Sequence, residues 1–219
     1  MGKIVIRTDG DKIRVRLREE AKAPEVRQAT GARTLEPTEI IKQNREMLLL
    51  PVRLINLMEN RVESGFRPNE EDVEIVYALS GINPNMPDML HKLSSSDVIE
   101  ANNPDYVITS VRAMMEYIVQ ERGNEPKLVI QIHTHPQGIS MPSQRDKTYF
   151  ANAAQSIKAL APGCHVIFGV HVLSSESIRE RLEPTKLSIN TLRWSSIRRE
   201  HEVGFYEPNG KIYEVELYG

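Results

Sequence analysis

Residues 132–146 read Ile-His-Thr-His-Pro-Gln-Gly-Ile-Ser-Met-Pro-Ser-Gln-Arg-Asp, and the interpretation of the whole chain starts from this stretch. His133 and His135 stand two residues apart at the end of a predicted strand, so both imidazoles project from the same face. The proline that follows cannot continue the strand ladder and turns the chain away. The chain returns at Ser143, which is typical of a helix N-cap, with Asp146 one turn inside the helix.

These residue types in this order are suitable ligands for zinc. Two imidazoles and one carboxylate supply three ligands and leave a fourth position for water, as catalytic zinc sites do. A capping box from Ser143 to Asp146 explains the same two residues without any metal, and paired histidines at strand ends are often only polar surface. Because a cap can also fix the carboxylate that binds, the two interpretations are compatible. From spacing alone, both remain open.

This stretch and a second one upstream together resemble the motif of a known protein family. His-x-His, seven residues and then Ser-x-x-Asp resembles the motif of the JAMM (MPN+) metalloprotease family position for position. That family also carries an upstream Glu in a stretch similar to Glu-x-x-Gly/Ala-Leu-Leu-x-Gly, and residues 74–81 read Glu-Ile-Val-Tyr-Ala-Leu-Ser-Gly. Tyr77 departs from the usual small residue and Ala78 from a leucine. The resemblance covers roughly residues 51–173, and it alone selects Glu74 among several available glutamates.

The resemblance implies a hydrolase with a role for each of five residues. His133, His135 and Asp146 would bind Zn²⁺, whose bound water is the nucleophile. Glu74 would be the general base, and the hydroxyl of Ser143 would face the developing oxyanion. The bond cleaved would be an isopeptide or peptide bond after the C-terminal glycine of ubiquitin or a ubiquitin-like protein. Ubiquitin-like conjugates or precursors are therefore the expected partners, with a proteasome-like assembly or a homodimer as further possibilities.

The resemblance also implies the fold class and guides the division into domains. We expect an α/β protein of the MPN (cytidine-deaminase-like) type, with a mixed, mostly antiparallel sheet flanked by helices. Alternating apolar residues over 3–17 around Asp9-Gly10 predict an additional β-hairpin. This hairpin and a polar linker are expected to form an N-terminal extension over residues 1–35, followed by the JAMM/MPN+ catalytic domain over residues 36–219.

Apolar periodicity and turn residues predict the other elements. Helices are expected from Pro37 onward, over 51–64 with a stop at Gly65, from Asn103 to Gly123, and over 143–160. Strands are expected over 127–133 and 164–173, and a hairpin over 202–217. Residues 83–97 have the composition of a loop. The excursion over 83–101 occupies the place where relatives, by resemblance, carry a loop that holds the substrate tail.

Composition restricts the remaining function classes. Lys plus Arg number 28 and Asp plus Glu 30, for a net charge of −2, which argues against a generic nucleic-acid binder. Cys164 is the single cysteine, so a disulfide framework, a CxxC pair and a four-cysteine zinc site are excluded, and we expect it to be buried. The start of the chain is not typical of a signal peptide, and no apolar run reaches the roughly 20 residues of a membrane span. We expect a cytoplasmic protein, of bacterial or archaeal type, without nucleic-acid or membrane partners.

Two alternatives to an isopeptidase stay open. MPN-type domains without metal can act as catalytically silent scaffold or dimerisation subunits, although all five site residues are present here. RadC-like proteins with a JAB domain carry a similar His-x-His-Pro stretch and would act on another substrate. The stretch over 74–81 and the near-zero net charge favour the isopeptidase. The other histidines (His91, His165, His171 and His201) have no ligand spacing among themselves and are expected to be surface or core residues.

Overall fold

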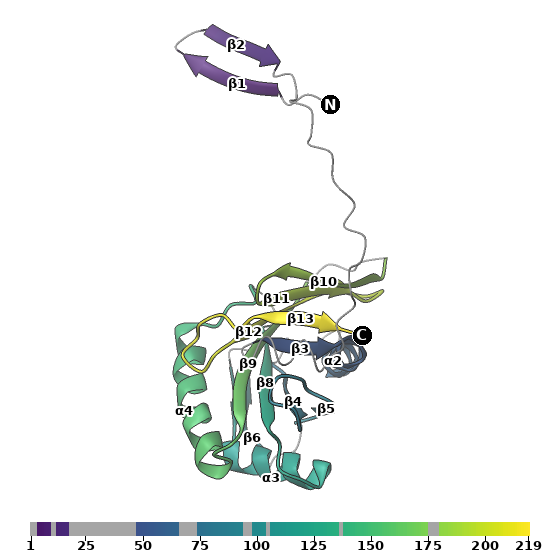
Figure 1. Cartoon of the computed structure of the whole chain (residues 1–219), viewed down its shortest axis with the longest axis vertical. Helices are drawn as coiled ribbons and strands as arrows, with labels where there is room; N and C mark the ends of the chain where they lie inside the picture. Colours follow the sequence, from purple (N-terminus) through teal and green to yellow (C-terminus); the bar gives the residue numbers. More distant parts are fainter. Residues whose placement is uncertain are drawn as a thin grey trace, which may run out of the picture. The chain divides into compact units, whose positions relative to one another are not determined.

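The computed structural model describes residues 4–9, 12–17, 47–65, 74–93, 98–103, 106–135, 138–174 and 180–219. The chain divides into two compact units, Met1–Glu39 and Ile40–Gly219 (Figure 1). In the first unit, β1 (Ile4–Asp9) pairs antiparallel with β2 (Lys12–Leu17), which confirms the strands of the predicted hairpin. The predicted boundary at residue 35 lies outside the described residues.

The second unit is built on a seven-stranded sheet with the order β10-β11-β12-β9-β8-β4-β5. Neighbouring strands are antiparallel throughout, except that β8 and β9 are parallel. The fold class is therefore confirmed as a mixed, mostly antiparallel sheet. Its strands are β4 (Val76–Gly81), β5 (Met89–His91), β8 (Leu128–His135), β9 (His165–Leu173), β10 (Leu182–Ser188), β11 (Thr191–Ser195) and β12 (Glu200–Tyr206).

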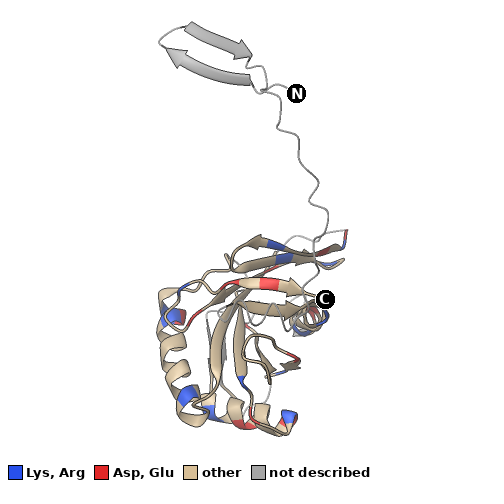
Figure 2. Cartoon of the chain, viewed as in Figure 1, with Lys and Arg blue, Asp and Glu red and all other residues tan. Residues whose placement is uncertain are grey.

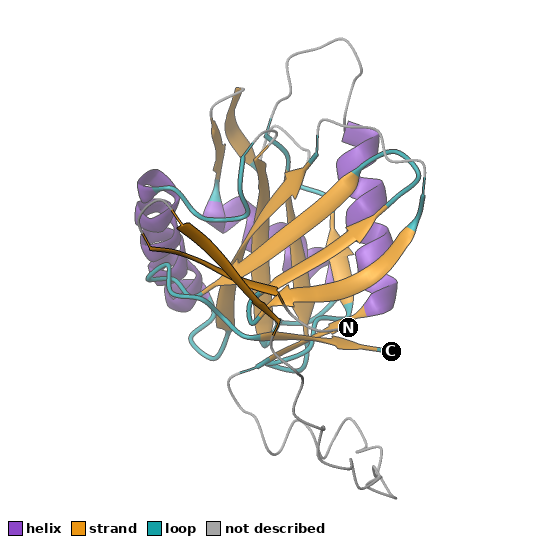
Figure 3. Ribbon diagram, turned by 90° about the horizontal axis from the view of Figure 1, so that it is seen from above, coloured by secondary structure: helices purple, strands orange, loops and turns teal. Residues whose placement is uncertain are grey.

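Helices cover both faces of this sheet (Figures 1 and 3). They are α2 (Val52–Gly65), α3 (Val111–Arg122) and α4 (Gln144–Leu160). Alternate side chains of each strand enter opposite faces. Ile130 and Ile132 of β8 join a core with α2, whereas Val129 joins a second core with residues of α3 and α4, such as Phe150. Because both faces of β8 are buried, its first five residues are apolar except for Gln131.

Two small sheets complete the described part of this unit. β3 (Leu48–Pro51) pairs in parallel with β13 (Val215–Tyr218) near the C-terminal end of the chain. β6 (Ile99–Asn103) pairs antiparallel with β7 (Tyr106–Thr109), immediately before α3.

The predicted elements with strong local signals are confirmed. The strands over 127–133 and 164–173 correspond to β8 and β9, and the helix over 143–160 corresponds to α4. The helix over 51–64 corresponds to α2. α3 ends at Gly123, whose φ of 75° lies in the left-handed region that a glycine C-cap readily adopts.

Other predictions are wrong because strand pairing overrules the local signals for helices and loops. The helix expected from Asn103 begins only at Val111, since the residues before it form β7 on β6. The stretch over 83–97, which was expected to be a loop, contains β5, and this strand extends the main sheet. Leu48–Pro51 is a strand, whereas the rest of the helix expected from Pro37 lies outside the described residues.

The prediction of a C-terminal hairpin over 202–217 is also wrong, because its two strands do not pair with each other as predicted. A tight turn does follow β12, where the Gly210 amide donates to the carbonyl of Glu207. Beyond an isolated bridge between Tyr206 and Ile212, however, the chain leaves β12 and β13 pairs with β3. β10 and β11 are additional strands that local patterns did not predict.

Charged residues of both signs are interspersed over the helices and outer strands of the described part (Figure 2). Within the described residues, no helix is both long and apolar enough to cross a membrane.

Candidate metal centre

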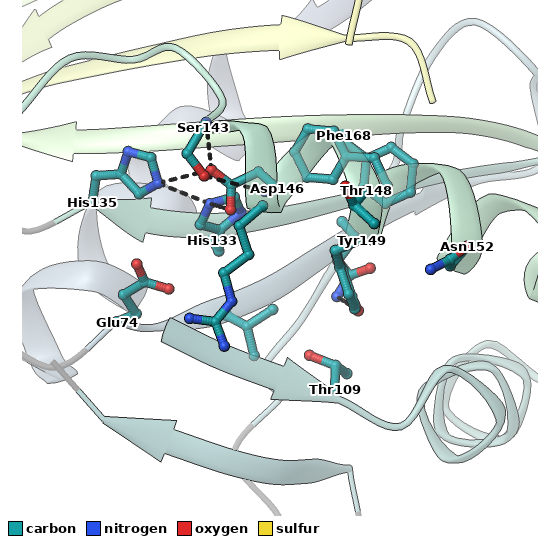
Figure 4. A pocket seen from close by; sticks show the side chains of 14 residues that line it. Glu74, Thr109, His133, His135, Ser143, Asp146, Thr148, Tyr149, Asn152 and Phe168 are labelled. Carbon is teal, nitrogen blue, oxygen red and sulfur yellow. Dashed lines mark hydrogen bonds and ion pairs between the residues drawn. The ribbon is translucent and has the colours of Figure 1, made fainter. Parts of the chain in front are cut away.

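The parallel pair β8–β9 and the helix between these strands place the predicted ligands. His133 and His135 are among the last three residues of β8, and α4 begins at the residue after Ser143. The N-terminus of α4 lies over the face of the sheet into which both imidazoles project (Figure 4). Asp146, in the first turn of α4, therefore meets the two histidines at the carboxyl end of β8, the usual place for ligands in α/β units.

Potential ligand atoms of three residues converge at this point. The Nε2 atoms of His133 and His135 are 3.1 Å apart. The carboxylate of Asp146 places Oδ1 3.3 Å from Nε2 of His133 and Oδ2 3.5 Å from Nε2 of His135. The side chains are only 10%, 19% and 18% exposed, respectively, for the two histidines and the aspartate. Such a group could hold a metal ion.

The separations of these atoms fit zinc. In a tetrahedral site with Zn–N and Zn–O bonds of about 2.0–2.1 Å, adjacent ligand atoms lie about 3.3–3.4 Å apart. The separation of 3.1 Å between the two Nε2 atoms and that of 3.3 Å between Nε2 of His133 and Oδ1 of Asp146 are close to that value, and Nε2 of His135 lies 3.5 Å from the other oxygen of Asp146. Two imidazoles and one carboxylate are also a ligand set that catalytic zinc sites use, with one position left for water or substrate.

The electrostatics of the cluster favour a charged carboxylate. Burial alone would raise the pKa of Asp146, but hydrogen bonds from the two imidazoles and from Ser143 hold it well below its usual value. Burial lowers the pKa of His135, yet Asp146, the charge of Glu74 and a backbone hydrogen bond at Ile139 raise it overall. Asp146 is thus ionised at neutral pH, the form in which it can bind a cation.

Ser143 and Asp146 form the predicted capping box. The amide of Asp146 donates to Oγ of Ser143 at 3.2 Å, and the amide of Ser143 donates to Oδ2 of Asp146 at 2.6 Å. This box fixes the carboxylate at the start of α4, so the cap and the metal-ligand interpretation hold together.

Glu74 lies beside the cluster, two residues before the start of β4. β4 pairs with β8 so that Val76 faces His133, and continuing this register brings Glu74 opposite His135. The amide of Ile75 donates to Oγ1 of Thr134, between the two histidines, at 2.8 Å and so ties the end of β4 to β8. Glu74 is 7% exposed and its charge acts on His135. Figure 4 shows its carboxylate on the same side of the pocket as His135.

All five predicted site residues line one pocket of about 510 Å³. The pocket continues away from the histidines along α4, where Thr109, Tyr149 and Asn152 lie (Figure 4). Val76, Phe150 and Phe168 form its apolar wall. Sequence reasoning did not single out these additional lining residues, because the pattern of the motif carries no signal for residues that other elements contribute.

The residues expected to have no part in the site lie elsewhere. Cys164 is 5% exposed, as predicted, and burial raises the pKa of its thiol to about 11. His91, His171 and His201 are fully buried and hydrogen-bonded, which confirms them as core histidines.

Comparisons with known proteins give a likeness of fold to solved structures. Neither a protein-family model nor a curated protein matches the chain. Among solved structures, it is similar to the crystal structure of a JAB1/MPN domain protein from Archaeoglobus fulgidus, with 13% sequence identity and a TM-score of 0.38. The match covers 78% of this chain and 98% of the other. The chemistry of the site is therefore inferred from its own geometry and motif.

Proposed function

We propose that this chain is a zinc-dependent hydrolase of the JAMM type, which cleaves isopeptide or peptide bonds after the C-terminal glycine of a ubiquitin-like protein. One observation carries the hydrolase part of the proposal. Two imidazoles and an ionised carboxylate converge at zinc-like separations in a pocket that a second buried carboxylate, Glu74, also lines. The motif resemblance supplies the substrate class.

Each side chain has a distinct task in this proposal. Zinc, when bound, supplies Lewis acidity and lowers the pKa of water towards neutrality. His133, His135 and Asp146 would hold it. Glu74 accepts a proton from the attacking water and delivers it to the leaving amine, a task that needs a carboxylate within reach of the reaction. The hydroxyl of Ser143 donates a hydrogen bond to the developing oxyanion, and losing one such donor typically costs about 10²–10³ in rate.

The test is cleavage of ubiquitin-like–peptide fusions, followed by intact-mass spectrometry, together with a measurement of bound zinc. Wild-type protein should bind one equivalent of zinc and cut after the terminal glycine, and a chelator should abolish cleavage. Glu74→Gln should retain zinc but lose about 10²–10⁴ in rate, because Glu74 lies outside the ligand cluster. Glu116→Gln, on the exposed surface of α3, is the matched control and should cleave as the wild type does.

The outcomes separate the alternatives. Absence of zinc binding would refute the hydrolase and favour a scaffold role. Zinc binding without cleavage of any ubiquitin-like fusion would contradict the proposed substrate and favour a RadC-like protein with another substrate.

A further inference from the structure

The loop that joins β8 to α4 is attached to β12 at Ser140. This residue lies between His135 and Ser143, and it is only 5% exposed. The hydroxyl of Tyr206, at the end of β12, donates a hydrogen bond to the backbone carbonyl of Ser140. The hydroxyl of Ser140 in turn donates to the carboxylate of Glu202 at 2.5 Å. Ser140 is thus held through both its backbone and its side chain.

Gly204, between these two β12 residues, permits the close approach of the loop. A Cβ atom at this position would lie 2.4 Å from the carbonyl oxygen of Ser140 and 2.7 Å from the hydroxyl of Tyr206. Because one of these atoms belongs to the backbone, the loop itself would have to move for any other residue to fit. The contact between loop and strand therefore depends on a glycine.

The acceptor of the Ser140 hydroxyl is itself fixed within the sheet. Glu202 stands directly opposite Arg193 in the pairing of β11 with β12. Arg193 donates from Nη2 to Oε2 of Glu202 at 2.9 Å, while Oε1 accepts from Ser140. The two carboxylate oxygens are thus used by two partners, and neither Glu202 nor the loop can shift without breaking a bond.

This attachment lies on the chain between the candidate metal ligands. Ser140 comes five residues after His135, the last residue of β8, and three residues before Ser143, the N-cap of α4. Bonds from residues outside the ligand set fix the position and orientation of the side chains that bind a metal.

We propose that Tyr206, together with Glu202 and Gly204, positions the metal ligands by fixing Ser140. On one side of Ser140, the chain leads back to His135 at the end of β8. On the other, three residues on, Ser143 begins the capping box that holds Asp146. This proposal rests on the proposed zinc site but not on its substrate. Loss of such an outer partner typically weakens metal binding about 10- to 100-fold.

The decisive variant is Tyr206→Phe, which removes only the hydroxyl that binds Ser140. The zinc dissociation constant of the full chain is measured by competition with a chromophoric chelator, and the Co²⁺-substituted protein provides an absorption spectrum that reports ligand geometry. We expect zinc binding to weaken about 10- to 100-fold and the Co²⁺ spectrum to change. Tyr77→Phe is the matched control, because it removes another buried tyrosine hydroxyl, bonded to His171 on the opposite face of the sheet. It should leave the zinc affinity within about twofold.

Each outcome decides the proposal. Equal zinc affinity of Tyr206→Phe and wild type, or equal weakening by Tyr77→Phe, would overturn the positioning role while leaving the zinc site intact. Zinc binding by the wild-type chain is measured before any variant is compared, because a wild-type chain that does not bind zinc would overturn both proposals. If Tyr206→Phe does not fold, Ser140→Ala provides the same test by removing the bond to Glu202. In that case unchanged zinc affinity and an unchanged Co²⁺ spectrum would refute the role of the attachment.

Discussion

Acid should destabilise this protein through a buried histidine pair on the face of the sheet opposite the candidate metal centre. The hydroxyl of Tyr77 lies 2.8 Å from Nδ1 of His171, whose Nε2 lies 3.0 Å from Nδ1 of His201. Nε2 of His201 lies 3.2 Å from the carboxylate of Glu63 on α2. Burial keeps Tyr77 protonated by raising its pKa, so it is the donor. Each neutral imidazole can then accept at Nδ1 and donate from Nε2, and the chain of bonds ends on a carboxylate.

The magnitude follows from proton uptake by the unfolded chain. Burial, and then the proximity of His201, lower the pKa of His171 well below its usual value. An unfolded histidine titrates near 6.5. As the pH falls through this value the unfolded chain binds a proton that the folded protein does not, so stability is lost on the acid side. Between about pH 7.5 and 5.5 this amounts to about 1.4 kcal/mol for His171.

His201 acts in the same direction. Burial and Arg199 lower its pKa, and Glu63 and Glu59 only partly oppose this. Its folded form therefore also binds fewer protons than its unfolded form as the pH falls below about 6.5.

Urea unfolding at the two pH values, with chelator present and ionic strength fixed, measures the effect. His171→Gln removes the titrating ring but leaves all other ionisable groups in place. The acid-induced loss of unfolding free energy should be smaller in this variant than in wild type by about 1.4 kcal/mol. If the two proteins lost the same free energy between the two pH values, the inference that His171 stays neutral in the fold would be refuted.

Three further predictions concern the core and the ends of elements. Phe150→Ala should lower the unfolding free energy in urea by about 3–5 kcal/mol, because Phe150 is fully buried and stacks on Phe168 at 4.3 Å; a loss below about 1 kcal/mol would contradict this packing. Gly123→Ala should cost about 1 kcal/mol from backbone strain alone, since a Cβ there meets nothing within 4 Å, and an unchanged thermal midpoint would argue against the left-handed cap. Cys164 should react with a disulfide reagent only slowly until urea unfolds the chain, because the thiol is buried and its pKa is about 11; fast native labelling would contradict its burial.

The elements predicted from sequence are those whose signals lie within the element. Ser143 and Asp146 define the start of α4 by a reciprocal cap, and the buried strand β8 begins with residues that are apolar except for Gln131. Asn103-Pro104-Asp105 is a counterexample, because the same residues favour either a helix start or a turn. The strands β6 and β7 on either side decide against the helix, and their pairing has no local signal.

The sequence by itself determined the types of the candidate metal ligands, their spacing and the strand–loop–helix unit that carries them, because strand alternation and helix capping act over a few residues. It could not select Glu74 without a family resemblance. Only the tertiary structure decided that Glu74 comes next to His135, because the register of β4 on β8 joins residues far apart in the chain. The attachment of Ser140 to Tyr206 is likewise a result of strand order, since β12 reaches the loop only by pairing with β9.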